Sequence, residues 1–155
     1  MSNRSHSYLA TTTWTGNQGT GTSHRTGYSR DHEIAIAGKP VITGSSDPSF
    51  RGDPSRHNPE DLLVSSLSAC HMLWFLALAA KAKIIVTAYI DHAEGTMQEQ
   101  PDGGGHFTSV VLRPEITLAP DSDRNAADAL HHRAHDLCFI SQSVNFPVTI
   151  EATYR

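Results

Sequence analysis

The stretch that decides the fold is residues 58–81, which read NPEDLLVSSLSACHMLWFLALAAK. Asn58 is a good N-cap, and Pro59 suits the first position of a helix. Glu60 and Asp61 follow, where the positive end of the helix dipole stabilises carboxylates. The apolar residues after them cover nearly every face. The stretch therefore predicts a central buried helix rather than an amphipathic surface helix.

Strand patterns lie on both sides of this helix. Alternating or β-branched residues predict strands at 8–14, 32–36, 41–43, 84–97, 107–118 and 148–154. A second helix is expected from a cap at Asp121 or Ser122 to about Phe139. The order β-β-β-α-β-β-α-β predicts a single α+β domain over residues 1–155, with antiparallel sheets packed around the central helix and a less regular segment at 1–27.

Two residues interrupt the long strand patterns. Gly95 lies inside the first strand that follows the central helix, where glycine indicates a bend. Pro114 lies inside the next strand and cannot donate to a ladder of hydrogen bonds, which indicates an edge or a bulge. The turn at residues 101–105 joins these two strands into a hairpin.

Composition restricts the classes of function. The chain has 155 residues with 38% hydrophobic residues and a net charge of −4, as expected for one globular domain. It has no basic run, which argues against nucleic acid as a partner. Residues 1–10 have no apolar core, so no signal peptide is expected. Residues 62–80 are apolar but contain three serines and a histidine, so we expect a soluble core helix, no membrane span and a cytoplasmic protein.

Two cysteines are the main candidates for chemistry. Cys70 lies in the central helix and Cys138 near the end of the second helix. In a reducing compartment such residues are either inert core thiols or a redox pair, and their sequence spacing does not decide between the two. Burial alone would make Cys70 inert, so a reactive Cys70 needs a cation from another element or another subunit.

The motifs around these cysteines resemble those of the OsmC/Ohr family of osmotically inducible and organic hydroperoxide resistance proteins. One motif runs from Asn58-Pro59-Glu60-Asp61-Leu62-Leu63 to Ser68-Ala69-Cys70-His71, and the other is Cys138-Phe139-Ile140-Ser141-Gln142-Ser143. The resemblance covers the chain from Tyr28 onward and is nearest to the OsmC-like subgroup.

The resemblance implies a thiol-dependent peroxidase that reduces organic hydroperoxides to alcohols. Cys70 would attack the peroxide and become a sulfenic acid, and Cys138 would convert that acid to a disulfide. Glu60 would position an arginine beside Cys70. Arg30 is our choice for that arginine, with Arg25 as the alternative and the loop residues Arg51 and Arg56 left open. No cofactor is implied, and an external dithiol, of lipoyl type by resemblance, would reduce the disulfide.

The spacing within the central helix adds a geometric expectation. Glu60 and Cys70 are separated by roughly 15 Å of helical rise, so they cannot meet along one straight helix. Either the start of the helix bends, or two central helices pack antiparallel across a two-fold axis. A helix that is apolar on nearly all sides favours the second arrangement, which is an intertwined homodimer with two sites at its interface.

Two alternatives come from other functional classes. The chain could be a stress-related or binding protein that keeps this fold without efficient chemistry. It could also bind a metal, because His131 and His135 share one helix face and Cys138 follows them. His132 stands where a zinc protease would need glutamate, which rejects that class, and an ordinary surface helix is the favoured interpretation. A role for His135 in tuning the disulfide is left open.

Overall fold

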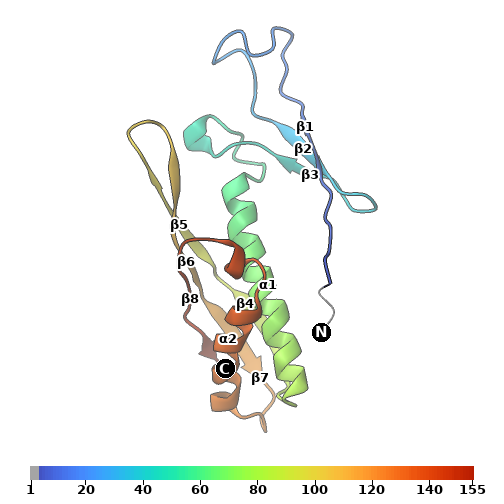
Figure 1. Ribbon diagram of the computed structural model, residues 1–155, viewed down its shortest axis with the longest axis vertical. Helices are drawn as coiled ribbons and strands as arrows, with labels where there is room; N and C mark the ends of the chain where they lie inside the picture. Colours follow the sequence, from blue (N-terminus) through green and yellow to red (C-terminus); the bar gives the residue numbers. More distant parts are fainter. Residues whose placement is uncertain (1–3) are drawn as a thin grey trace. The chain divides into compact units, whose positions relative to one another are not determined.

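The computed structural model describes residues 4–155, which form two compact units that meet in sequence at Leu62 and Leu63. The described chain has two α-helices and three small sheets, which confirms the α+β class (Figure 1). Each unit is considered by itself below.

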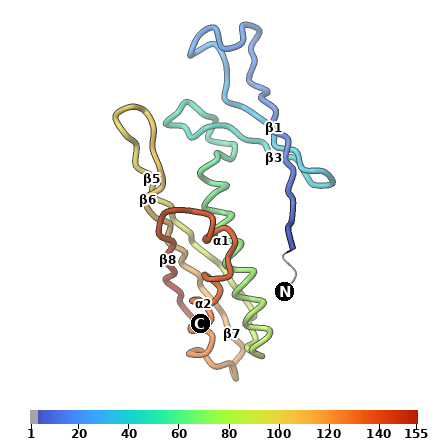
Figure 2. Tube along the Cα trace, in the orientation of Figure 1, coloured from blue at the N-terminus to red at the C-terminus, as the bar shows by residue number. Residues whose placement is uncertain are grey.

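The first unit contains an antiparallel meander. Its strands are β1 (Thr11–Trp14), β2 (His32–Ala35) and β3 (Ile42–Gly44), paired in the order β1-β2-β3. The long connection from β3 toward the helix contains one turn of 3-10 helix, η1 (Pro48–Phe50), and can be followed in Figure 2. Asp47 caps this turn by accepting a hydrogen bond from the Ser49 N–H at 2.7 Å.

Helix α1 (Pro59–Lys81) begins where the sequence predicts. The Asn58 side chain accepts a hydrogen bond from the Asp61 N–H at 2.7 Å, and the Asp61 carboxylate accepts one from the Asn58 N–H at 3.3 Å. This reciprocal pair satisfies two backbone donors at the start of the helix. After the helix ends, Lys83 adopts a left-handed conformation with φ of 60°, which turns the chain toward Ile84.

Only one face of α1 is buried within the single chain. Its buried residues recur every fourth position, whereas Leu73 on another face is 62% exposed. Within the single chain the elements of the second unit cover one side of α1 only, and the cover that the sequence predicts for its other faces would have to come from a second copy. By length and composition α1 could also cross a membrane, with a mean hydropathy of 1.8 over a window that is 22% buried.

Two mixed sheets, helix α2 and most of α1 form the second unit. The elements are β4 (Val86–Asp91), β5 (Glu94–Glu99), β6 (Gly105–Leu112), β7 (Pro114–Leu118), α2 (Arg124–Leu137), the 3-10 turn η2 (Ser141–Ser143), β8 (Val148–Ile150) and β9 (Thr153–Tyr154). One sheet has the order β4-β7-β9 and the other β5-β6-β8. The pairings of β4 with β7 and of β5 with β6 are antiparallel, as predicted, but β8 pairs parallel with β6 and β9 pairs parallel with β7.

The two long predicted strands are each broken in two. The first break falls at His92 and Ala93 rather than at Gly95, and the second falls at Arg113, beside the proline that signalled it. Gly95 has a different role, because a Cβ there would lie 2.6 Å from the Cγ2 of Val64. A glycine at this position lets α1 lie close to the sheet.

Helix α2 begins slightly later than predicted. Its N-cap is Asp123 rather than Asp121 or Ser122, and the Asp123 carboxylate accepts hydrogen bonds from the N–H groups of Asn125 and Ala126. The helix ends at Leu137, and Cys138 is its C-cap in an extended conformation. The chain thus turns away from the helix axis directly at the second cysteine.

Candidate active site

The second unit brings the two cysteines together. Cys70 is half-buried in the middle of α1, and Cys138 is fully buried at the end of α2. Both are free thiols, and the Cys138 side chain is a direct neighbour of the Cys70 sulfur. The backbone N–H of Ser141 donates to the Cys138 sulfur at 3.4 Å. The residues that follow α2 therefore hold Cys138 against the middle of α1.

Apolar contacts explain why this segment stays beside Cys70. Ile140 packs against a buried cluster that contains Leu67, one helical turn before Cys70. Phe139 contacts Trp74, one turn after Cys70, edge to face at 6.0 Å between ring centroids. Contacts on both sides of Cys70 fix the segment along α1.

The surroundings of Cys70 act on its acidity in opposite directions. Burial raises the pKa of the Cys70 thiol, and the neighbouring Cys138 thiol raises it further. The backbone N–H groups of Ile140 and Phe139 point at the Cys70 sulfur and lower its pKa, but less strongly. Within the second unit the net pKa is raised, so Cys70 is a protonated thiol at neutral pH. A further cation would be needed to make it a thiolate.

The surface next to Cys70 is apolar. Leu73, one helical turn after Cys70, is 62% exposed. Phe139, which contacts Trp74 on the same turn, is 72% exposed. An exposed apolar side chain beside a half-buried thiol indicates a surface that contacts something apolar.

Glu60 has an unusual environment at the start of α1. One carboxylate oxygen of Glu60, Oε2, is buried and has no hydrogen-bond partner among residues 4–155. A buried carboxylate oxygen without a donor is costly, so this position is suited to receive a cation or a hydrogen-bond donor.

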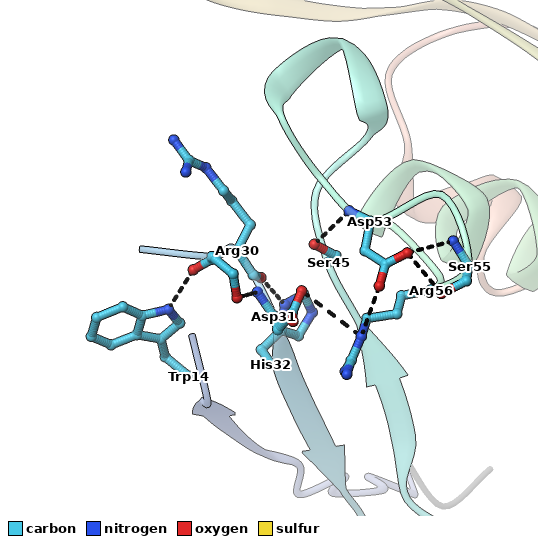
Figure 3. A network of polar contacts seen from close by, with 9 residues as sticks. Trp14, Arg30, Asp31, His32, Ser45, Asp53, Ser55 and Arg56 are labelled. Carbon is cyan, nitrogen blue, oxygen red and sulfur yellow. Dashed lines mark hydrogen bonds and ion pairs between the residues drawn. The ribbon is translucent and has the colours of Figure 1, made fainter. Parts of the chain in front are cut away.

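Arg30 does not fill that position in the described chain. Its guanidinium donates to the carbonyl oxygens of Tyr28 at 2.8 Å and Arg25 at 3.1 Å, and it stacks on the Tyr28 ring at 4.3 Å. Among the residues described, no hydrogen bond or ion pair joins Arg30 to Glu60. In Figure 3 the Arg30 side chain points away from the polar network around Asp31.

That network includes Arg56, one of the two loop arginines that the sequence left open as candidates. Arg56 lies 3.8 Å from the Asp31 carboxylate and 3.6 Å from that of Asp53 (Figure 3). Asp53 also accepts hydrogen bonds from the N–H and hydroxyl groups of Ser55, and these bonds lower the pKa of the Asp53 carboxyl. Arg56 therefore stabilises the loop before α1.

The histidines of α2 differ from the expectation of a surface helix. His131 is buried, and its Nδ1 lies 2.9 Å from the Nε2 of His71, the residue after Cys70. His132 is exposed and lies 3.4 Å from the Asp136 carboxylate. His135 has a buried Nδ1 without a hydrogen-bond partner. The surface interpretation is thus wrong for His131, because a long-range partner on α1 stabilises it inside the core.

The described part of the chain does not hold a ready metal site. Over residues 4–155, no group of three or more His, Cys, Asp or Glu side chains is arranged to hold a metal ion.

The sequence did not predict a second polar contact of α1, which joins Ser68 to Asp91. The Ser68 hydroxyl donates to the Asp91 carboxylate at 2.5 Å, and the other oxygen of Asp91 accepts the Arg113 N–H at 2.7 Å. Asp91 thereby supplies a hydrogen-bond acceptor for the backbone N–H of Arg113, which lies at the break between β6 and β7. Serines inside an apolar helix were the only signal, and they do not identify a partner on a distant strand.

Comparisons with known proteins agree with this arrangement. The sequence matches the family model for OsmC-like protein over residues 52–153. No curated protein sequence matches the chain. An OsmC-like protein of unknown function from Vibrio cholerae has a similar structure, with a TM-score of 0.86 and 32% sequence identity over 96% of this chain and 100% of that one.

More distant structures share the fold. An organic hydroperoxide resistance protein from Elizabethkingia anophelis has a TM-score of 0.71 and 20% identity, covering 99% of this chain and 98% of its own. Another from Legionella pneumophila has a TM-score of 0.69 and 19% identity, covering 96% of each chain. As the motifs around Cys70 and Cys138 predict, the chain belongs to the OsmC-like protein family.

Proposed function

We propose that this chain is a thiol-dependent peroxidase that reduces organic hydroperoxides to alcohols. Cys70 is the nucleophile and Cys138 is the resolving thiol. The observation that carries the proposal is the proximity of two free cysteines that lie far apart in the sequence, close enough for Cys138 to raise the pKa of Cys70. The exposed apolar side chain of Phe139, which contacts Trp74 one turn after Cys70, favours an organic peroxide over hydrogen peroxide.

The proposed chemistry has two balanced steps. The Cys70 thiolate attacks one oxygen of the hydroperoxide, so that an S–O bond forms, the O–O bond breaks and the leaving alkoxide takes a proton to become the alcohol. Sulfur loses two electrons and the peroxide gains them. The Cys138 thiol then attacks the Cys70 sulfenic acid, an S–S bond forms and water leaves. An external dithiol reduces the disulfide by exchange, and a lipoyl-type dithiol in the cytoplasm is our proposal.

The first step requires a cation beside Cys70, since burial and Cys138 keep its pKa raised. We assign this role to Arg30, oriented by the unpartnered carboxylate oxygen of Glu60. To take it, Arg30 would give up its bonds to the carbonyls of Tyr28 and Arg25. A guanidinium favours the thiolate and can also polarise the peroxide oxygen.

Exchange of Arg30 for methionine tests this assignment. At neutral pH, Arg30→Met is expected to slow the reaction of Cys70 with an organic hydroperoxide roughly tenfold to a hundredfold, because loss of the cation raises the thiol pKa by one to two units. Stopped-flow kinetics over a pH series would measure both the rate and the pKa. Arg25→Met is the matched control, and a larger effect of Arg25→Met than of Arg30→Met would contradict the assignment.

The exposed face of α1 favours association of two copies. Apolar side chains remain exposed on a helix whose other face is buried, and Leu73 is the most exposed large one. A second copy of the same chain would cover this face by symmetry. We therefore propose a homodimer in which the α1 helices of two copies pack together.

A charge on this face should separate the two copies. Leu73→Glu is expected to weaken the dimer by roughly a hundredfold in dissociation constant, because it places a carboxylate in an apolar contact. Sedimentation velocity across a concentration series would measure it. Ile85→Glu, an equally exposed apolar position at 61% that lies outside α1, is the matched control. A wild-type protein that is monomeric at micromolar concentration would contradict the dimer.

Turnover is the direct test of the proposed function. The reduced protein is given an organic hydroperoxide and dihydrolipoamide, and loss of peroxide is followed over many equivalents. We expect multiple turnovers, with faster consumption of cumene hydroperoxide than of hydrogen peroxide. No consumption above the rate of the free dithiol would overturn the peroxidase and leave a binding protein with this fold.

A further inference from the structure

A pair of buried histidines joins the two helices that hold the cysteines. His71 on α1 is 0% exposed and His131 on α2 is 6% exposed. The Nε2 of His71 and the Nδ1 of His131 are 2.9 Å apart, and the two rings are nearly coplanar at 7°. Phe75 stacks on the His131 ring at 4.4 Å between centroids. The proposed redox steps use neither imidazole.

The position of this pair connects it to both cysteines. His71 directly follows Cys70, and His131 lies two turns, roughly 10 Å of rise, before Cys138. Among residues 4–155, the bond between His71 and His131 is the only side-chain hydrogen bond from α1 to α2. Phe75 of α1 and Ala134 of α2 also belong to one apolar cluster, and apolar contacts tolerate sliding and repacking better than a directional hydrogen bond does.

A purely structural role does not account for the pair. The Nδ1 of His71 and the Nε2 of His131 are buried and have no hydrogen-bond partner in the described chain. In either arrangement of the shared proton, one N–H therefore stays unpaired. Leucine or methionine would fill the same space without that penalty. What the histidines add is a fixed distance between α1 and α2.

We propose that the hydrogen bond between His71 and His131 positions the end of α2, so that Cys138 reaches Cys70 for the resolving step. This inference rests on the proposed peroxidase function. A disulfide forms only within narrow limits of Cβ and sulfur geometry, so a small shift of α2 slows the attack of Cys138 on the sulfenic acid. The two histidines are positioning residues, since neither bonds to a sulfur.

Slower resolution has a chemical consequence. The Cys70 sulfenic acid then meets a second hydroperoxide before Cys138 attacks it. In that side reaction sulfur gains a second oxygen and becomes a sulfinic acid, while the peroxide is reduced to a second alcohol. Disulfide and sulfinic acid are therefore the two outcomes of one intermediate, and their ratio reports how well Cys138 is positioned.

The test compares variants that keep or lose the bond. His131→Asn places an amide where Nδ1 lies and keeps the bond, whereas His131→Leu removes it. Ile116→Val loosens the apolar cluster that contains Phe75 and Ala134 and leaves both histidines in place, so it is the control for stability. Intact mass spectrometry after graded doses of cumene hydroperoxide gives the ratio of disulfide to sulfinic acid, and stopped-flow gives the rate of the first oxidation.

For His131→Leu we expect over-oxidation at a roughly tenfold lower peroxide dose, with the first oxidation rate unchanged. His131→Asn should return to within about twofold of wild type, and Ile116→Val should match wild type. If His131→Leu does not fold, His71→Met against His71→Gln makes the same comparison. Equal ratios in the bonded and unbonded variants, or an equal shift in Ile116→Val, would overturn the positioning role. A wild type whose Cys70 is not oxidised would instead overturn the proposed function.

Discussion

Cys70→Ser is expected to lower the rate of organic hydroperoxide consumption by roughly four orders of magnitude or more. A serine hydroxyl at this position stays protonated and cannot take the place of the thiolate, so the step in which the S–O bond forms is lost. Loss of a nucleophile commonly costs an enzyme this much or more. Coupled steady-state assays with a dithiol reductant would measure the loss.

Cys138→Ser is the matched control for this prediction. Because Cys138 acts after the peroxide has been reduced, the first oxidation of Cys70 should keep its wild-type rate to within about threefold. The sulfenic acid then has no internal partner, and over-oxidised Cys70 should accumulate. If Cys70→Ser kept consuming peroxide while Cys138→Ser did not, the two roles would be reversed.

Acid is expected to destabilise the protein before its carboxylates are protonated. Burial, together with the neighbouring His131 and His135, lowers the pKa of His71 to about 4. Burial also lowers the pKa of His131 to about 4, although Asp128 and Asp91 act in the opposite direction. Histidine in an unfolded chain titrates near pH 6.5, so the unfolded state binds more protons between pH 6.5 and pH 4.

The free energy of unfolding should therefore fall as the pH is lowered through this window. The loss is of order 3 kcal/mol for each histidine by pH 4, since one pKa unit corresponds to about 1.4 kcal/mol. Denaturant titrations at a series of pH values would measure it. The double variant His71→Gln/His131→Asn has no titrating ring in the pair and should show a much flatter slope. A wild-type protein equally stable at pH 7 and pH 4.5 would contradict the buried neutral pair.

The start of α1 could be predicted because its signals are local. Asn58, Pro59 and Asp61 act on backbone groups within one helical turn, and the structure has the cap that they predict. Pro114 likewise signals the break at Arg113, but the break at His92 and Ala93 could not be predicted in this way. It follows Asp91, which bonds to Ser68 and to the backbone of Arg113, and neither partner is near in sequence.

The direction in which neighbouring strands pair could not be predicted either, because it depends on partners that are distant in sequence. Alternation of side chains identifies a strand and its buried face, but it is the same for parallel and antiparallel neighbours. The last predicted strand, at 148–154, is two short strands that pair parallel with β6 and β7.

The candidate site was predicted in part. The spacing of Cys70 and Cys138 does not indicate contact, and the resemblance to a family supplied that expectation. The burial of His131 was missed, because a helix with histidines at adjacent positions is typical of a solvated surface. Its partner His71 lies sixty positions earlier, and its burial comes from the packing of α2 against Phe75.

The intact mass of the reduced protein, before and after one equivalent of an organic hydroperoxide, distinguishes a redox pair from two inert thiols. We expect the wild type to lose two hydrogens and a peptide linked through Cys70 and Cys138 to appear on digestion. Cys70→Ser should show no change of mass. An unchanged wild-type mass would mean that Cys70 is an inert core thiol, and it would contradict the peroxidase reaction proposed here.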